Sequence, residues 1–243
     1  NFMLPELYAS SHLTENFKSK AIKLTSWDLT PRQICDLELI MNGGFYPLDG
    51  FLSQKDYEEV VENMRLANGK IWPIPITLDV SKEFADTVKP KQDIALRDQE
   101  GVILAILSIS DKWVPDKKRE AKKVFGSDDA AHPGVHYLKN LAAPIYLGGK
   151  ITGIQKPVHY DFRGRRNTPN ELRSYFQKLG WNQIVAFQTR NPLHRAHQEL
   201  TFRAAKEVQA NLLIHPVVGM TKPGDVDHFT RVRCYEAVLN KYP

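Results

Sequence analysis

Two short apolar runs in the last third of the chain constrain its fold most strongly. Residues 183–187 read QIVAF, residues 211–218 read NLLIHPVV, and residues 193–208 between them have a helical composition. Continuous apolar strands joined through a helix are typical of a parallel sheet covered on both faces, and such crossovers are nearly always right-handed. The sequence therefore predicts an α/β unit here, introduced by a helix over residues 169–179.

The first 160 residues follow a different pattern, in which short apolar runs alternate with turn residues and occasional helices. Thr30 before Pro31 predicts the start of a helix within residues 27–39, and Ser53 predicts the cap of a second helix over residues 54–64. Strands are expected at residues 74–80, 93–97 and 101–110, and a hairpin is expected to join the last two.

The stretch between Pro157 and Pro169 is rich in charge, glycine and proline and has no sustained hydrophobic period. It separates the two patterns, so we expect one domain over residues 1–160 and a second over residues 161–243. The first reads as an α+β domain and the second as the start of an α/β domain.

The composition is that of an ordinary globular protein, with 42% hydrophobic and 25% charged residues. No apolar run approaches the ~20 residues that span a bilayer, the N-terminus lacks the pattern of a secretory signal, and the two cysteines have no CxxC partner. A cytoplasmic protein with no membrane partner is expected. The net charge of +5 admits acidic partners, but the basic run at residues 117–123 is predicted to be the solvated face of a helix rather than a nucleic-acid site.

The segment QTRNPLHRAH, residues 188–197, follows the first apolar run. Ligands of open parallel sheets bind beyond the carboxyl ends of the strands, where helix N-termini offer free N–H groups and the positive end of a dipole. Asn191 is predicted to cap the next helix, with Pro192 in its first turn. The segment therefore predicts an anion site.

The side chains of this segment suit a phosphate or sulfate ligand. His194 and His197 are three residues apart and are expected to project from one helical face, and Arg190 adds a guanidinium fork. Gln188 and Thr189 contribute neutral donors. Because no serine or cysteine lies within the segment, the chemistry is expected to be direct transfer, in which one bound anion attacks a phosphorus and the site stabilises the developing charge.

Other interpretations of these residues are weaker. The two histidines could ligate zinc, but no third ligand is fixed nearby, and a histidine of such a pair could also be a satisfied structural residue. His215, within the second apolar run, is predicted to be buried and hydrogen-bonded rather than catalytic. No Walker motif and no GxGxxG motif follows a strand, which disfavours a P-loop kinase and a dinucleotide dehydrogenase.

Longer co-linear segments resemble the ATP sulfurylase (sulfate adenylyltransferase) family in its fungal and bacterial form. They are LTPRQICDLELIMNGGFYPLDGFL from Leu29, WPIPITLDV from Trp72, NTP from Asn167, QTRNPLHRAHQEL from Gln188 and HPVVGMTKPGDVDHFTRVR from His215. The resemblance implies a PUA-like β-barrel domain followed by the start of a Rossmann-like α/β nucleotidyltransferase domain of the HxxH superfamily. It also implies the transfer of an adenylyl group from Mg-ATP to sulfate, which gives adenosine 5'-phosphosulfate and pyrophosphate.

The resemblance implies a role for each residue of the motif. Thr189, Arg190 and Asn191 are expected to be the active residues, and Gln188 and Arg190 to hold sulfate. Residues 188–191 line the ATP site, together with His194 and His197, which stabilise the phosphates in the transition state. The magnesium ion accompanies the nucleotide, with no protein-bound metal, and the protein is expected to be a homo-oligomer.

Nothing in the chain matches the GRDHAG-type loop that follows later in the family, so this chain is expected to be one piece of a longer enzyme. Two other functions stay open at this point. One is a different HxxH nucleotidyltransferase, for example one acting on a phosphorylated alcohol. The other is RNA binding by the PUA-like half, although that half lacks an evident stripe of basic and aromatic residues.

Overall fold

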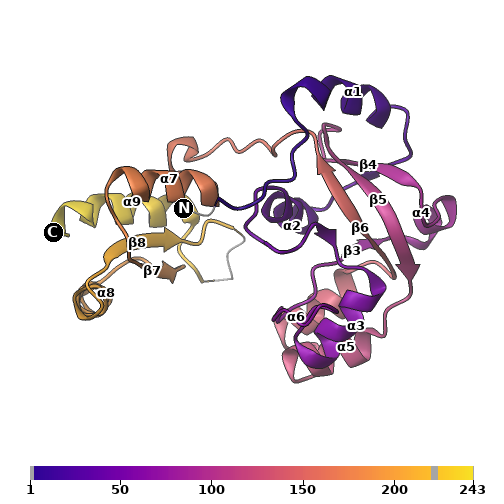
Figure 1. Ribbon diagram of the computed structural model, residues 1–243. Helices are drawn as coiled ribbons and strands as arrows, with labels where there is room; N and C mark the ends of the chain where they lie inside the picture. The colour runs from indigo at the N-terminus through magenta and orange to yellow at the C-terminus, as the bar shows by residue number, and fades with distance from the viewer. Residues whose placement is uncertain (1–2, 220–223, 243) are drawn as a thin grey trace. The chain divides into compact units, whose positions relative to one another are not determined.

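The computed structural model describes residues 3–219 and 224–242 (Figure 1). The chain divides into two compact units, Asn1–Asn170 and Glu171–Pro243. Residues 220–223, which belong to the segment from His215 quoted above, lie outside the described residues.

The first unit is built on a mixed sheet of six strands with the order β1-β4-β5-β6-β2, in which β3 also pairs with β6. Strands β1 and β4 run parallel, and the other neighbours run antiparallel. The strands are β1 (Ser26–Asp28), β2 (Gly50–Phe51), β3 (Leu78–Val80), β4 (Asp93–Arg97), β5 (Ile103–Trp113) and β6 (Ile145–Gly153). The predicted hairpin of β4 and β5 is confirmed, and β5 runs three residues beyond the predicted end at residue 110.

The helices of the first unit begin where local capping signals predict. Helix α2 (Pro31–Met41) starts at a capping box, in which the Thr30 hydroxyl accepts the N–H of Gln33 at 3.3 Å and the Gln33 side chain accepts the N–H of Thr30 at 3.0 Å. Helix α3 (Gln54–Asn63) is capped by Ser53. The others are α1 (Ser11–Ala21), α4 (Lys82–Thr87), α5 (Lys117–Phe125), the short α6 (Pro133–His136), the π-helix η1 (Tyr137–Leu141) and the 3-10 turn η2 (Arg163–Arg165).

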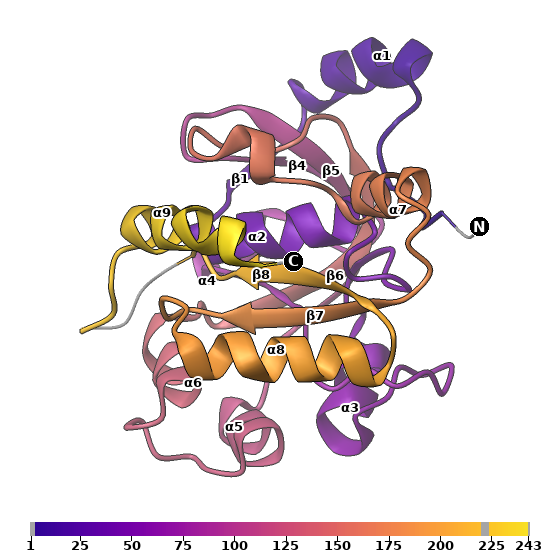
Figure 2. The same ribbon diagram turned by 90° about the vertical axis from the view of Figure 1, so that its left-hand side faces the viewer.

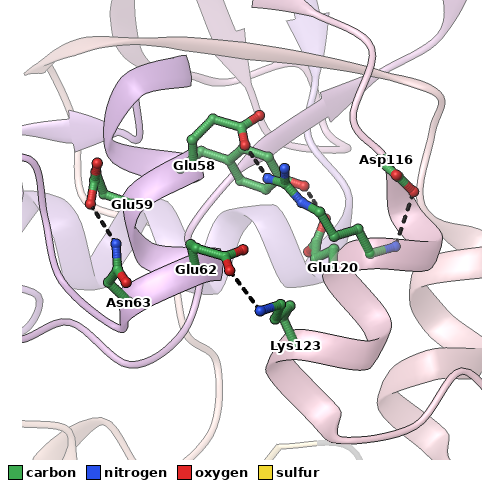
Figure 3. A network of polar contacts seen from close by, with 9 residues as sticks. Glu58, Glu59, Glu62, Asn63, Asp116, Glu120 and Lys123 are labelled. Atoms are coloured by element: carbon green, nitrogen blue, oxygen red, sulfur yellow. Dashed lines mark hydrogen bonds and ion pairs between the residues drawn. The ribbon is translucent and has the colours of Figure 1, made fainter.

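The basic run of residues 117–123 is helical, as predicted, and two of its five basic side chains pair with α3. The guanidinium of Arg119 bonds Glu58, and the Lys123 ammonium lies 2.6 Å from Glu62, so the two helices are joined across their exposed faces (Figure 3). Exposed pairs of this kind contribute only about 0.2–1 kcal/mol each. The run is therefore a helix surface rather than an open basic patch.

A carboxyl group is buried beneath that surface. Glu120 is 6% exposed and accepts hydrogen bonds from the hydroxyls of Tyr57 at 2.9 Å and Tyr146 at 3.1 Å. Burial raises the pKa of Glu120, and the two tyrosine bonds oppose that rise. The rest of the core is apolar, with Leu37, Leu78 and Leu107 fully buried between the sheet and its helices.

One predicted strand of the first unit is mostly wrong. Residues 74–80 were expected to form a strand, but only Leu78–Val80 pairs with β6. Pro73 and Pro75 lack the N–H groups that a ladder needs, so this segment cannot pair along its whole length.

The second unit contains the predicted parallel pair. Strand β7 (Ile184–Thr189) runs parallel to β8 (Asn211–Pro216), from Ile184 beside Asn211 to Thr189 beside Pro216. The connecting helix is α8 (Arg195–Glu207), which packs on one face of the strand pair, while α9 lies on the other face (Figures 1 and 2). The remaining elements are α7 (Pro169–Lys178), α9 (His228–Val238) and the 3-10 turn η3 (Leu239–Lys241).

The prediction for His215 is wrong. Its side chain is exposed rather than buried. Strand side chains project to the two faces of a sheet, and the residues that the structure describes leave His215 uncovered on its face.

Candidate active site

The six predicted site residues lie in one short segment of the second unit, from the end of β7 to the first turn of α8. Gln188 and Thr189 end β7, the chain then turns through Arg190 and Asn191, and helix α8 begins at Arg195 with His194 as its N-cap. The loop lies at the carboxyl end of a parallel strand, where ligands of such sheets bind. The sequence therefore located the loop correctly.

The prediction that Asn191 caps α8 is wrong. An N-cap residue uses its carbonyl to accept the first bond of the helix, but the carbonyl of Asn191 accepts the hydroxyl of Tyr235 at 2.5 Å instead. The N–H of Asn191 donates to the Thr189 hydroxyl at 3.1 Å. These bonds hold the loop outside the helix, whose N-cap is His194, three residues later than predicted.

His194 is an N-cap of an unusual kind. Its carbonyl accepts the N–H of Gln198 at 3.1 Å, yet its side chain makes no cap bond. The first turn of a helix leaves several N–H groups without partners inside the helix. With no capping side chain over them, these donors and the positive end of the α8 dipole are available to an anion.

The two histidine rings lie close together, although His194 is the extended N-cap of α8 and not a member of the helical face that was predicted. The ring centroids of His194 and His197 are 3.9 Å apart, and the His197 ring also lies 5.5 Å from that of Phe187. The Nδ1 atom of His197 is buried and has no hydrogen-bond partner among the described residues. An imidazole N–H of such a pair can donate a hydrogen bond to an oxygen of an anion beside it.

Arg190 is held by a residue that the sequence did not single out. Its Nε atom lies 3.8 Å from the Oδ2 atom of Asp225, whose side chain is 14% exposed, while the Arg190 side chain is 43% exposed. The carboxylate restrains the guanidinium and leaves much of it open to a ligand. Nothing in the local pattern could reveal this pair, because the two residues lie 35 positions apart.

Helix α9 supports the loop from below through two further residues that the sequence reasoning missed. Arg231 is 1% exposed and donates from Nη1 to the carbonyl of Arg190 at 2.7 Å. Tyr235 is 4% exposed and bonds the carbonyl of Asn191. Burial raises the pKa of the Tyr235 hydroxyl, which therefore stays protonated as a donor. An arginine and a tyrosine four residues apart share a helix face. That spacing was the one feature of the sequence that could have pointed to these two residues.

The loop thus combines one guanidinium, a close histidine pair and a helix N-terminus. This set can bind and orient negatively charged oxygens and stabilise charge that develops on them. No three His, Cys, Asp or Glu side chains lie close enough to hold a metal ion in the part of the chain that the structure describes. No helix within residues 3–219 and 224–242 has the length and apolar character needed to cross a membrane.

Comparisons with known proteins agree on both parts of the chain. Residues 2–156 match the PUA-like domain and residues 163–243 match the ATP-sulfurylase domain. The sulfate adenylyltransferase of Schizosaccharomyces pombe is 56% identical over 95% of this chain and 48% of its own length. The sulfate adenylyltransferase of Saccharomyces cerevisiae is 51% identical over 99% of this chain and 48% of its own length.

A solved structure is similar to nearly the whole chain. The hexameric APS kinase from Thiobacillus denitrificans matches 99% of this chain and 43% of its own chain, with a TM-score of 0.81 and 34% sequence identity. The chain spans less than half the length of the curated relatives it matches.

Proposed function

Because the chain belongs to the ATP sulfurylase family, we propose that the protein carrying it is a sulfate adenylyltransferase, which transfers the adenylyl group of Mg-ATP to sulfate. The products are adenosine 5'-phosphosulfate and pyrophosphate. The observation that carries the proposal is the loop at residues 188–197, in which a half-exposed guanidinium and a histidine pair gather at an uncapped helix N-terminus.

In the proposed reaction a sulfate oxygen attacks the α-phosphorus of ATP in line with the departing pyrophosphate. The new oxygen–phosphorus bond forms as the bond to the pyrophosphate oxygen breaks, so negative charge grows on the phosphate oxygens. No covalent intermediate with the protein is needed. The residues of the loop act by position and charge.

The proposed roles follow from where each side chain lies. Arg190, restrained by Asp225, and Gln188 hold sulfate, while residues 188–191 line the ATP site. His194 and His197 stand at the start of α8, and they stabilise the phosphates in the transition state. Thr189 accepts a bond from the N–H of Asn191, which leaves its hydroxyl hydrogen for a ligand oxygen.

Magnesium is proposed to enter with the nucleotide. The loop offers cationic and neutral donors, and the carboxylate of Asp225 already neighbours Arg190. Phosphate oxygens rather than a protein cage would then hold the ion, as is common for Mg²⁺ in nucleotide sites.

The finer details of the fold are proposals of the same kind. They are a barrel-like closure of the PUA-like domain over residues 1–160, an HxxH-type α/β domain from residue 161, assembly as a homo-oligomer and a cytoplasmic location. The support is the mixed six-stranded sheet, the parallel β7–β8 pair and the hexameric state named for the similar solved structure.

The test is sulfate-dependent exchange of pyrophosphate into ATP by the full-length protein. The variants His194→Ala and Arg190→Ala are expected to lose about 100- to 1000-fold in rate, as is typical when one transition-state donor is removed. The matched controls are His12→Ala on α1 and Arg203→Ala on α8, both exposed, which should exchange like the wild type. Exchange that proceeds without sulfate, or that survives both loop variants, would contradict the proposal.

A further inference from the structure

The carbonyl groups of residues 189–191 accept hydrogen bonds from Val217, which follows β8, and from two side chains of α9. The carbonyl of Thr189 accepts the N–H of Val217 at 3.0 Å and lies 3.5 Å from the Tyr235 hydroxyl. The carbonyls of Arg190 and Asn191 accept bonds from Arg231 and Tyr235 at 2.7 and 2.5 Å. The loop backbone is thus fixed at each of its three central residues.

The direction of these carbonyls matters for an anion. A peptide unit is planar, so turning its oxygen toward α9 turns its other edge away from α9. Each carbonyl oxygen carries partial negative charge and would repel a phosphate or sulfate placed next to it. With the oxygens of residues 189–191 drawn toward β8 and α9, the ligand meets the side chains of the loop instead, since Pro192 has no N–H and the N–H of Asn191 donates to Thr189.

Arg231 adds charge as well as a hydrogen bond. It is 1% exposed, and its Nε and Nη2 atoms have no hydrogen-bond partner among the described residues. Buried polar atoms without partners are rare and costly, and a guanidinium stays charged in proteins. The buried guanidinium of Arg231 therefore places positive charge next to the loop that is proposed to bind anions.

We propose that Arg231 and Tyr235 are positioning residues of the active site, which hold the carbonyl oxygens of residues 189–191 away from the bound anions. This inference rests on the proposed function of the loop. Neither residue needs to touch a substrate. Both act through the backbone that carries Arg190 and Asn191.

The experiment compares Tyr235→Phe, Arg231→Lys and Arg231→Met in the full-length protein. Tyr235→Phe removes one hydroxyl, and the loss of one such bond corresponds to roughly 5-fold in the population of the competent loop. Arg231→Met removes a charged donor and is expected to cost roughly 10- to 100-fold, with Arg231→Lys between the two. The loss should fall mainly on kcat rather than on KM, because alignment matters most in the transition state.

A second readout does not depend on turnover. Amide hydrogen exchange of a peptide covering residues 188–194 should accelerate in Tyr235→Phe by a similar factor, while exchange in β8 stays unchanged. The matched controls are Tyr175→Phe on α7 and Arg203→Met on α8, whose side chains are exposed. Both controls should retain the kcat, the KM and the amide hydrogen exchange of the wild type.

The outcomes separate this inference from the proposed function. If the wild type shows no sulfate-dependent exchange of pyrophosphate into ATP, the proposed function fails. Faster amide hydrogen exchange of the loop in Tyr235→Phe would still support the positioning role. If His194→Ala loses activity but Tyr235→Phe and Arg231→Lys keep wild-type kinetics and loop protection, the positioning role is overturned. Equal loss of protection in the loop and in β8 overturns it too, because that pattern is general destabilisation. Should Arg231→Met fail to fold, Tyr235→Phe decides.

Discussion

The buried carboxyl group of Asp36 in α2 leads to a quantitative prediction about how stability depends on pH. The side chain of Asp36 is 14% exposed, and its Oδ2 atom has no hydrogen-bond partner among the described residues. The Nε atom of Arg32 lies 3.7 Å away, too far for a good hydrogen bond. Burial raises the pKa of Asp36 from 3.8 to about 6; Arg32 opposes the rise and Asp79 adds to it.

The sign of the effect follows from that direction. A carboxyl group whose pKa is higher in the folded state favours folding when it is protonated, and this stability is lost as the pH rises through the folded pKa. A rise from 3.8 to about 6 corresponds to ~3 kcal/mol, at about 1.4 kcal/mol per pKa unit. Asp36→Asn removes the charge, so this variant should be more stable than the wild type by up to ~3 kcal/mol at pH 7 and equally stable near pH 3.5.

The assay is urea denaturation of residues 1–243 at a series of pH values in a Trp181→Phe background, so that the other tryptophans of this sequence, Trp27, Trp72 and Trp113, all lie in the first unit. The difference in unfolding free energy between Asp36→Asn and its parent should grow mainly between pH 4 and pH 6. Asp86→Asn, an exposed position on α4, serves as the control and should show no such growth. A variant that is no more stable at pH 7, or a difference that does not depend on pH, would refute the reasoning.

Three further predictions concern the first unit. Thr30→Ala removes the capping box of α2 and should lower the unfolding free energy by about 1 kcal/mol; an unchanged urea midpoint would contradict it. Tyr57→Phe leaves Glu120 with one tyrosine donor and should lower the free energy of unfolding by about 1–3 kcal/mol at pH 7. The loss should be smaller at pH 4, where the carboxyl group is more protonated. A loss that does not change with pH would contradict this prediction. Gly50→Ala would push a Cβ into the Gly149 carbonyl oxygen and should cost at least about 2 kcal/mol, which thermal denaturation can measure; a neutral effect would show that β2 shifts freely.

Local signals in the sequence predicted the helix starts well. Thr30 and Ser53 cap their helices through bonds to residues only three positions away, so the pattern of neighbours contains the whole interaction. The parallel β7–β8 pair was also predicted, because two apolar runs flanking a helix leave few other arrangements. By contrast, the strand expected over residues 74–80 shortened to Leu78–Val80, since the prolines remove ladder donors.

The same comparison explains the error at Asn191. By its local sequence, Asn191 before Pro192 is as good a helix start as Thr30 before Pro31. Asn191 does not become a cap because its carbonyl is bound by Tyr235, which lies 44 positions later in the chain. A local pattern cannot register a competitor at that distance.

The sequence by itself therefore predicted where the candidate loop lies, since strand, loop and helix N-terminus are local features and the motif at residues 188–197 contains its own basic residues. Only the tertiary structure decided how that loop is held. Asp225 restrains the side chain of Arg190, and Arg231 and Tyr235 fix the backbone of residues 190 and 191. These contacts join residues 35 to 44 positions apart, and they exist only because α9 packs beneath the end of β7, which is a property of the folded unit rather than of any one segment.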